Sequence, residues 1–148
     1  MSEVVDPSQF AVGIGFPCGH SVASQTAFSL VRTAAMASAI KVPLSIHTVV
    51  GCPIVTHARD VALDNFLATD EKFLFWIDSD IVWNPKDFFR VLAMTAQLGV
   101  VAAAYSEKKE GNPVSATVLP EAQTPNELGC IEMLSCGLGF TCVRRDVI

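Results

Sequence analysis

The run Phe73-Leu74-Phe75-Trp76-Ile77 constrains the fold more than any other segment, because five bulky apolar residues follow one another without a break. Successive side chains of a β-strand point to opposite faces of the sheet, so a strand of this composition must be buried on both faces. Such strands are typical of sheets that carry helices on both sides. The run ends in Asp78 and Asp80, which makes its end a candidate functional site.

Strand-like and helix-like segments alternate from the start of the chain to Tyr105. We predict strands at 10–16, 43–50, 73–77 and 100–105, and helices at 21–40, 55–68 and 85–98. The third helix has clear end signals, with Asn84 as its N-cap, Pro85 at the first helical position and Gly99 after the last turn. This alternation predicts a doubly wound α/β sheet that is covered on both faces.

The pattern changes after Tyr105. A polar loop at 106–112 precedes a strand-like segment at 114–119 and a second polar loop at 120–129. The closing segment, 131–143, carries a strand at 140–143 after a bend at Gly137 and Gly139. The sequence contains no internal repeat, low-complexity tract or interdomain linker, so we expect residues 1–148 to form a single domain.

Composition limits the classes of partner. The chain is 51% hydrophobic, with a mean hydropathy of +0.42, and its net charge of -5 gives no general attraction to nucleic acid. No apolar stretch reaches the roughly 20 residues of a spanning helix, and the N-terminal residues lack the features of a signal peptide. The five cysteines are odd in number and form no C-x-x-C pair, so we interpret them as small, reduced core residues. We therefore expect a cytoplasmic protein with no transmembrane segment.

Asp78 and Asp80 stand one residue apart at the end of the apolar strand. If the strand alternation continues, both carboxylates point the same way at the mouth of the sheet. Two hard oxygen ligands in this place suit Mg²⁺ or Mn²⁺, with open positions left for substrate phosphates. The alternative is that one aspartate caps the following helix, but Asn84 with Pro85 offers that helix a better start.

Several cationic and imidazole side chains lie near predicted strand-to-helix turns. Arg59 is early on the second helix, where the free N–H groups of a helix start favour anions, or it pairs on the surface with Asp60 or Asp64. His20 and His57 form a weak candidate metal pair, and the more ordinary role of each is a local hydrogen bond.

Tyr105 and Lys108 follow the fourth predicted strand. Lys108 is placed to offset phosphate charge, or it belongs to a solvated loop. Gly137 and Gly139 indicate either a close approach of the backbone to a ligand or a bend between strands. Gly13 and Gly15 do not complete a dinucleotide fingerprint, because its sixth position is Cys18, and the chain has no P-loop.

In their order these motifs resemble those of a glycosyltransferase of the A-type fold, close to family 2. Pro17 closes the first predicted strand, Ala58-Arg59-Asp60 resembles the A-R-N of the nucleotide-contacting helix, and Asp78-Ser79-Asp80 resembles the D-x-D. Tyr105 and Lys108 resemble the Y-x-x-K that follows the fourth strand. Gly137-Leu138-Gly139-Phe140 with Arg144-Arg145 resembles the G-x-G-F…R-R segment near the acceptor site. The resemblance covers roughly 10–148.

The resemblance implies a three-layer Rossmann-like sandwich with a mostly parallel central sheet. It implies transfer of a glycosyl group from a nucleoside diphosphate sugar to an acceptor, with Mn²⁺ or Mg²⁺ as cofactor. Asp78 and Asp80 would hold the metal, and Gly137 and Gly139 would lie on the acceptor side. The residues that would contact the nucleotide or donor are Pro17, Arg59, Asp78, Ser79, Tyr105 and Lys108.

Two features depart from the family pattern. Asp60 replaces the usual Asn after the arginine, and no catalytic Asp or Glu is recognisable beyond the G-x-G-F segment, where only Asp146 follows Gly139. The chain ends at Ile148, so either it is the donor-binding part of a longer enzyme or it uses another route. The general base, and with it the status of the chain as an enzyme, stays unassigned.

Three other readings remain. A non-catalytic sugar-nucleotide-binding module would explain the missing base. A haloacid-dehalogenase-like phosphatase would share the D-x-D-x-[TV] pattern at Asp78–Val82, but that motif usually lies near the start of its domain and an acidic pair follows it. A nucleotidyltransferase usually has a basic, Gly-rich first loop, and residues 17–21 contain no Arg or Lys.

Overall fold

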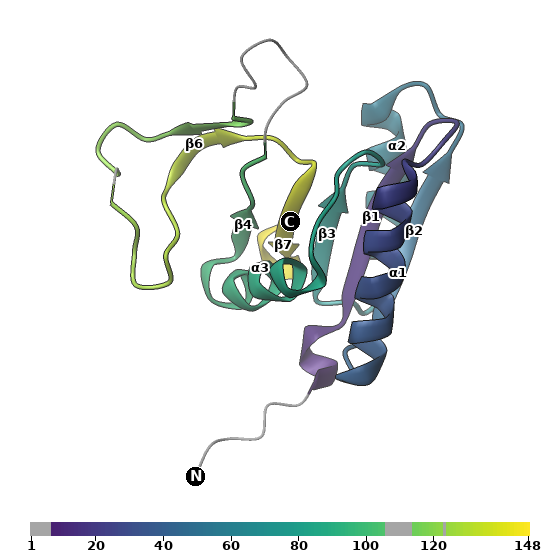
Figure 1. The fold of residues 1–148 in the computed structure, drawn as a ribbon, viewed down its shortest axis with the longest axis horizontal. Helices are drawn as coiled ribbons and strands as arrows, with labels where there is room; N and C mark the ends of the chain where they lie inside the picture. Colours follow the sequence, from purple (N-terminus) through teal and green to yellow (C-terminus); the bar gives the residue numbers. More distant parts are fainter. Residues whose placement is uncertain (1–6, 106–113, 123) are drawn as a thin grey trace.

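The computed structural model describes residues 7–105, 114–122 and 124–148, which form a mixed α/β fold (Figure 1). The described residues contain three helices and seven strands, which alternate as expected as far as β4, and two short 3-10 helices at Pro7–Phe10 and Arg145–Val147. The elements are β1 (Val12–Cys18), α1 (Ser24–Ala39), β2 (Leu44–Val50), α2 (Val55–Leu67), β3 (Phe73–Ile77), α3 (Pro85–Leu98), β4 (Val100–Ala102), β5 (Ala116–Val118), β6 (Met133–Cys136) and β7 (Phe140–Arg144).

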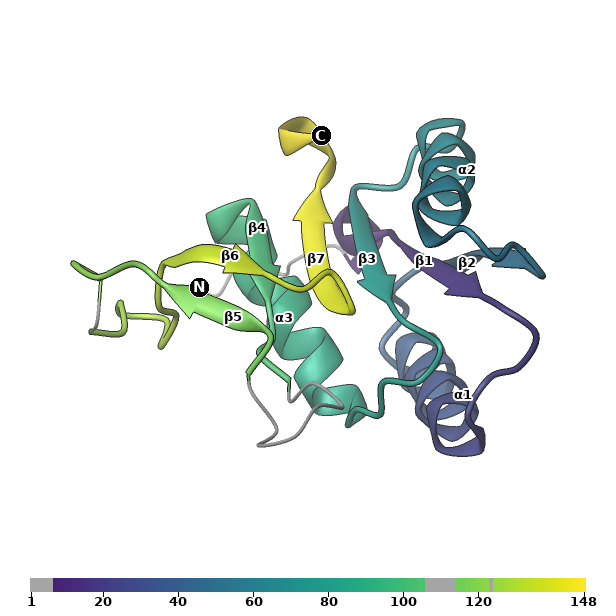
Figure 2. The same ribbon diagram turned by 90° about the horizontal axis from the view of Figure 1, so that it is seen from above.

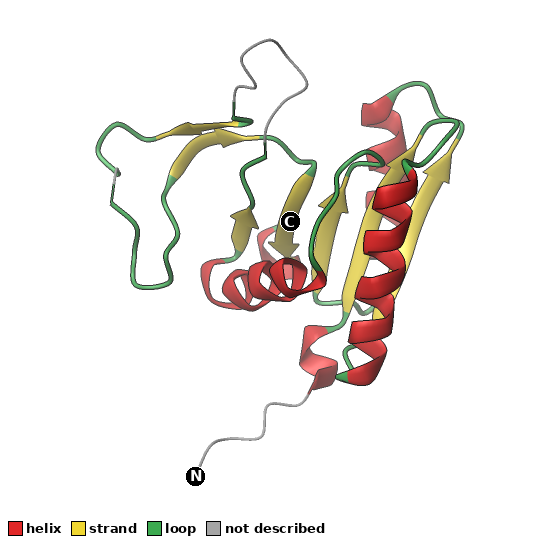
Figure 3. Ribbon diagram, in the orientation of Figure 1, coloured by secondary structure: helices red, strands yellow, loops and turns green. Residues whose placement is uncertain are grey.

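Five strands form one sheet in the order β2-β1-β3-β7-β4, and β5 and β6 form a separate antiparallel pair beside it (Figure 3). Strands β1, β2 and β3 are parallel, whereas β7 runs antiparallel to both of its neighbours. The sheet is therefore mixed. Helices α1 and α3 lie on one side of it and α2 on the other, as Figure 2 shows.

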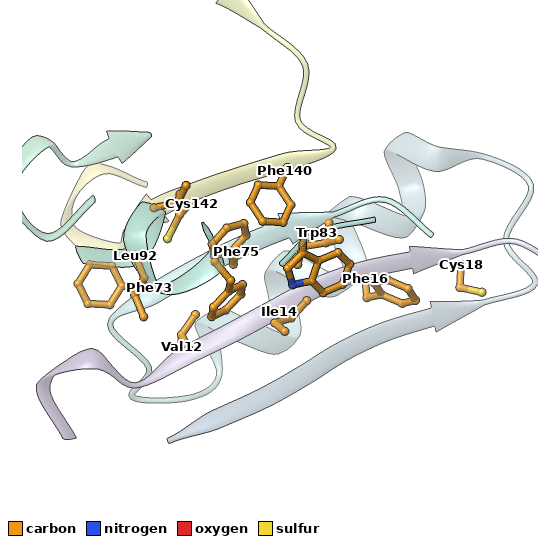
Figure 4. Close-up of a cluster of buried hydrophobic side chains, with 13 residues drawn as sticks. Val12, Ile14, Phe16, Cys18, Phe73, Phe75, Trp83, Leu92, Phe140 and Cys142 are labelled. Carbon is orange, nitrogen blue, oxygen red and sulfur yellow. The ribbon is translucent and has the colours of Figure 1, made fainter. Parts of the chain in front are cut away.

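Strand β3 matches the predicted run 73–77 and is buried along its whole length. Phe75 faces α3 and stacks on Phe88 with ring centroids 4.3 Å apart. Leu74 and Trp76 face the other way, into a cluster with Phe66 of α2. The two-sided burial that the sequence predicted is confirmed, and the larger core, on the α1 and α3 side, is drawn in Figure 4.

Strand β1 also divides its side chains between two environments. Val12, Ile14 and Phe16 belong to the larger core, whereas a Cβ on Gly15 would lie 2.5 Å from the ring of Trp76. Glycine on this face of β1 therefore makes room for the indole of Trp76 on the neighbouring strand. In the sequence this feature appears as Gly13 and Gly15, two positions apart. The structure explains Gly15 by packing and not by phosphate binding.

Several boundaries differ from the sequence-based expectation, and the fourth strand, predicted at 100–105, already ends at Ala102. The first strand begins at Val12, because Phe10 is part of the first 3-10 helix, and it continues through Pro17 to Cys18. Proline is tolerated there because β3 pairs with β1 only as far as Gly15, so the missing N–H removes no ladder bond on that side. The antiparallel course of β7, between β3 and β4, was not predicted.

Helix α3 has the predicted boundaries, 85–98. The side chain of Asn84 accepts a hydrogen bond from the backbone N–H of Lys86 at 3.0 Å, and Gly99 ends the helix with a φ of 84°. Helix α1 is shorter than predicted and begins at Ser24. None of the helices in the described part of the chain has the length and apolar character that crossing a bilayer requires.

All five cysteines are free, but they do not share one environment. Cys18 and Cys142 are buried, and burial raises the pKa of the Cys142 thiol to about 12, which keeps it protonated and inert. Cys136 is exposed, and Cys52 and Cys130 are half-buried. The prediction of reduced cysteines therefore fits all five, whereas the prediction that they lie in the core fits Cys18 and Cys142 only.

Polar side chains join α1 to the loop before α3. The indole N–H of Trp83 donates to Thr33 Oγ1 at 2.9 Å, and the backbone N–H of Trp83 donates to Ser29 Oγ at 3.2 Å. The Thr33 hydroxyl in turn donates to the carbonyl of Ser29 at 2.8 Å. These buried bonds fix Trp83, which packs against Phe140 and so connects α1 with β7.

Thr33→Val should lower the free energy of unfolding by about 1 to 3 kcal/mol, because it leaves the buried indole N–H of Trp83 without an acceptor. Thr33→Ser keeps the hydroxyl and removes one methyl group, so its loss should stay near 0.8 kcal/mol. Urea unfolding of both variants, followed by circular dichroism, measures the difference. An equal loss in the two variants would show that the hydrogen bond contributes nothing.

Candidate functional site

The carboxyl ends of β1 and β3 form the edge where the strand order reverses. From β1 the chain crosses to β2 on one side, and from β2 it returns through α2 to β3 on the other side. In open α/β sheets, ligands bind outside the carboxyl ends of the strands at such a reversal. Cys18 and Ile77 are the last residues of these two strands, so the candidate site begins with Asp78.

Arg59 and Asp78 form an ion pair at this edge. Asp78 follows the side-chain alternation of Leu74 and Trp76, which brings it to the α2 side of the sheet, and Arg59 Nη2 donates to Asp78 Oδ1 at 2.8 Å. The two side chains are 22% and 33% exposed, so water screens the pair only in part. Arg59 had Asp60 and Asp64 as alternative partners in the sequence, and the structure pairs it with Asp78.

The guanidinium of Arg59 is not fully satisfied by that pair. Its Nε is buried and, within the described part of the chain, finds no hydrogen-bond partner. Leaving a buried donor unpaired costs about 1 to 3 kcal/mol. Buried donors without a partner are uncommon in folded proteins, so this nitrogen sets Arg59 apart from an ordinary surface arginine.

Asp80 lies beyond the end of the strand alternation. The backbone N–H of Ile81 donates to the carbonyl of Asp78 at 3.2 Å, so the chain turns immediately after β3 and Asp80 sits exposed in that turn. Its direction is therefore set by the turn and not by the pleat of β3, which differs from the geometry assumed in the sequence analysis. Ser79 holds the turn against α1, because its carbonyl accepts the N–H of Ala23 at 3.1 Å.

Tyr105 and the two glycines before β7 complete one wall. Gly139 N donates to the Tyr105 hydroxyl at 3.1 Å, and Asp78 N donates to the carbonyl of Gly139 at 3.1 Å. A Cβ on Gly139 would lie 2.6 Å from the Tyr105 hydroxyl and 2.9 Å from Asp78 Oδ2, and a Cβ on Gly137 would overlap the same hydroxyl. The glycines are needed because Tyr105 approaches this backbone closely.

The remaining predicted site residues have varied positions. Pro17 is buried in β1, one residue before its end. His20 and His57 are both exposed, and within the described ranges no group of three or more His, Cys, Asp or Glu side chains is placed to hold a metal ion. Lys108 lies outside the described residues.

The Arg144-Arg145 pair is at the opposite edge of the sheet. Because β7 is antiparallel to β3, Phe140 lies beside Ile77 and Arg144 beside Phe73. Arg144 Nη1 donates to the carbonyl of Ala96 in α3 at 2.7 Å, and Arg145 Nη2 donates to that of Leu67 in α2 at 2.8 Å. Both arginines therefore cap helix C-termini.

Asp146 shares this far edge of the sheet. Its carboxylate accepts from Arg144 Nε at 2.6 Å and from Arg144 Nη2 at 3.1 Å. Asp146 is thus a partner of a capping arginine and takes no part in the cluster around Asp78.

A second polar cluster joins β2 to the loop before β3, and sequence reasoning missed it. His47 Nε2 lies 2.7 Å from Glu71 Oε2 and 3.1 Å from Ser45 Oγ, and the Ser45 hydroxyl also donates to Glu71. In a nucleophile relay, the two imidazole nitrogens serve the nucleophile and the carboxylate separately. Here both groups contact the same nitrogen, so the cluster is a structural connection and not a catalytic triad.

A cavity adjoins the site through Cys136 without including Asp78. It has a volume of about 860 Å³ and lies between α3, β4 and the β5–β6 pair, with Met94, Val101 and Met133 among its lining residues. Cys136 lines the same cavity and directly precedes Gly137. Cys136 therefore links the lining of the cavity to the wall formed by Tyr105 and the glycines.

Comparison with known proteins gives a likeness of fold. No family model matches the chain, and no curated protein matches it. The crystal structure of A197 from STIV, a viral protein, superposes with a TM-score of 0.65 at 23% sequence identity. The match covers 92% of this chain and 65% of that one, so the mixed α/β fold is shared over nearly all of the present sequence.

Glu71 should make stability depend on pH. Burial acts to raise the pKa of this carboxyl, but hydrogen bonds from Ser45, His47 and Thr69 outweigh burial and lower it below its ordinary value. A lowered folded-state pKa stabilises the fold above the unfolded-state pKa, and that stability is lost as the pH falls through the folded-state pKa. Glu71→Gln should flatten the acid limb of a thermal melting series from pH 7 to pH 3, and an unchanged acid limb would exclude this carboxyl as its source.

Gly139→Ala should destabilise the fold by about 1 to 3 kcal/mol, because the added methyl group overlaps the Tyr105 hydroxyl. Tyr105→Phe removes that hydroxyl, so the double variant should recover part of the loss. Chemical denaturation of the single and double variants gives the coupling energy between the two positions. Strict additivity would contradict the close approach described above.

Proposed function

We propose that this chain binds a nucleoside diphosphate sugar at the carboxyl edge of β1 and β3 and transfers its glycosyl group to an acceptor with the help of a divalent metal ion. The observation that carries the proposal is the Arg59–Asp78 pair at the strand-order reversal, with Asp80 exposed in the turn that follows. The finer fold class, a three-layer Rossmann-like sandwich of the glycosyltransferase A type, is part of this proposal.

The donor set around the turn is compatible with Mn²⁺ or Mg²⁺. These ions bind through one or two protein carboxylates and take their other ligands from phosphates and water. Asp80 is exposed, and Asp78 has its Oδ1 bonded to Arg59 while Oδ2 faces Gly139. When bound, the metal would stabilise the negative charge that develops on the leaving diphosphate.

Apart from the metal, donor binding is assigned to side chains of this chain. Arg59 holds the carboxylate of Asp78 in one orientation and adds a positive charge beside the place proposed for the diphosphate. Tyr105 fixes the backbone of Gly139, which in turn bonds the N–H of Asp78. Pro17, Ser79 and Lys108 are assigned to the donor side, the last from its sequence position alone.

The acceptor side is assigned to Gly137, Gly139 and the cavity that begins at Cys136. No general base is assigned, so a non-catalytic sugar-nucleotide-binding module is the alternative that turnover would separate. A phosphatase with Asp78 as nucleophile is less favoured, because the guanidinium bonded to Oδ1 withdraws electron density from the carboxylate that would attack.

Nucleoside diphosphates should raise the melting temperature of the chain in the presence of Mn²⁺ and much less without it, because a ligand that binds the native state stabilises it. Asp80→Asn and Asp78→Asn should abolish the metal-dependent part of the shift. Arg59→Ala should weaken nucleotide binding by about 1 to 3 kcal/mol, the range for a lost charge-assisted hydrogen bond. A thermal-shift panel followed by titration calorimetry measures both effects.

Asp64→Asn is the matched control, since Asp64 is an exposed carboxylate on α2 outside the candidate site. It should bind nucleotide as the unmodified chain does. Unchanged metal dependence in both Asp78→Asn and Asp80→Asn would refute the assignment of the metal. Nucleotide binding without glycosyl transfer or sugar-nucleotide hydrolysis would favour the binding module.

A further inference from the structure

The cavity between α3, β4 and the β5–β6 pair has the size and lining of a ligand site. Its volume of about 860 Å³ falls within the roughly 300 to 1,000 Å³ of pockets that hold small ligands, which are lined mainly by apolar side chains. Aliphatic and sulfur-containing side chains from α3, β4, β6 and the loop before β6 make up most of the described lining. The lining residues with charged or amide side chains are Asp87, Arg90, Asn126 and Glu132, and all four are exposed.

The cavity runs along β4, away from the candidate site. Ala103 N donates to the carbonyl of Phe140 at 3.0 Å, and Phe140 pairs with Ile77, so Ala103 lies level with the end of β3. Val100 lies at the start of β4, about 10 Å further from that edge. Both Ala103 and Val100 line the cavity, which therefore extends from the edge that holds Asp78 towards the opposite edge of the sheet.

A β-bulge turns two further side chains towards the cavity. Cys136 pairs with Ala116, and Met133 pairs with Val118, because β6 has one extra residue, Leu134, at the register shift. Ala116 and Val118 share one face of β5, so the bulge brings Met133 and Cys136 to one face of β6. Thioether and thiol groups are polarisable and adapt to apolar ligands of irregular shape. The sulfur-containing residues of the lining are Met94, Cys130, Met133 and Cys136.

The cavity meets the candidate site at Cys136. This residue directly precedes Gly137, and a Cβ on Gly137 would overlap the Tyr105 hydroxyl. A Cβ on Gly139 would lie 2.6 Å from the same hydroxyl and 2.9 Å from Asp78 Oδ2. A ligand in the cavity can therefore place one end beside the candidate site while the rest of it lies along β4.

We propose that this cavity binds the aliphatic chain of the acceptor, with the acceptor hydroxyl at the Cys136 end. The identity of the ligand as an acceptor rests on the proposed function, whereas the binding of an aliphatic chain does not. In the transfer, the hydroxyl oxygen would bond to the anomeric carbon of the donor. The bond from that carbon to the diphosphate would break with its electron pair, and the hydroxyl proton would be released to water.

An aliphatic chain fits this lining better than a second sugar. The part of the lining along β4 consists of valine and alanine side chains, at 100–103. Each saccharide hydroxyl buried there without a hydrogen bond would cost about 1 to 3 kcal/mol, whereas a methylene group gains about 0.8 kcal/mol from burial.

Straight-chain primary alcohols from butanol to decanol are the probes, titrated calorimetrically into the unmodified chain without Mn²⁺ or nucleotide. Each added methylene group should lower the dissociation constant about fourfold. The diol of the same length as decanol should bind at least about fivefold more weakly, because its second hydroxyl is buried among apolar side chains. Equal affinity of diol and alcohol, or no binding of decanol at its solubility limit, would overturn the proposal.

Alkylation with iodoacetamide locates the bound alcohol in the unmodified chain. Cys130 lines the cavity, with its Sγ 3.6 Å from Met94 Sδ, whereas Cys52 lies outside the described lining. At about ten times the dissociation constant of decanol the cavity is empty in about one molecule in eleven, so Cys130 should react about elevenfold more slowly. Cys52 is half-buried like Cys130 and should keep its rate. Peptide mass spectrometry measures both rates, and equal slowing of the two thiols, or no slowing of Cys130, would contradict the proposed place.

Met133→Glu should raise the dissociation constant of decanol at least about tenfold, because it places a charge in the apolar lining. Leu134→Glu is the matched control, since Leu134 is the adjacent residue, is 67% exposed and lies outside the described lining. It should leave the dissociation constant unchanged. An equal effect of the two variants would refute binding in this cavity.

The two proposals fail separately. Nucleotide binding without alcohol binding would overturn the present inference and leave the proposed function standing. Alcohol binding without nucleotide binding would refute the proposed function and the assignment of the alcohol as an acceptor, and it would keep the cavity as a site for aliphatic chains.

Discussion

The burial of β3 on both faces is the constraint on which the rest of the structure depends. Phe75 requires α3 on one side, and Leu74 and Trp76 require α2 on the other. Both helices are therefore held against the same short strand, and the alternation that orients Trp76 also brings Asp78 to the α2 side. The ion pair with Arg59 follows from this packing, because the strand and the helix supply one partner each.

Much of this architecture is predictable from residue patterns, and the exceptions have physical causes. The end signals of α3 are local, in Asn84 and Gly99, and they appear where expected. The antiparallel insertion of β7 depends on long-range pairing, which no local pattern encodes. The site follows the same rule: Asp78 could be placed from strand periodicity, whereas Asp80 could not, because a turn intervenes. Tyr105 and Gly139 come from segments that are far apart in the sequence. The only local sign of their contact was the glycine itself.

The polar side chains at the two edges of the sheet differ in their exposure and in their hydrogen bonds. At the carboxyl edge of β3, Asp80 is exposed and the buried Nε of Arg59 has no hydrogen-bond partner within the described part of the chain. At the opposite edge Arg144 and Arg145 donate to helix carbonyls, and Asp146 accepts from Arg144. Arginine and aspartate therefore close helix ends at one edge and form the Arg59–Asp78 pair at the other, which motif order alone does not distinguish.

The position of β7 between β3 and β4 also bears on how the chain assembles. In the described sheet β4 pairs only with β7, although β4 precedes β7 by nearly forty residues in the sequence. Strands β1, β2 and β3 can pair as soon as they are made, but β4 has no place in the sheet until β7 docks beside β3. Closing that long loop carries an entropic cost before any contact repays it. The side of the sheet that holds Gly139 and Tyr105 is thus expected to form last during folding.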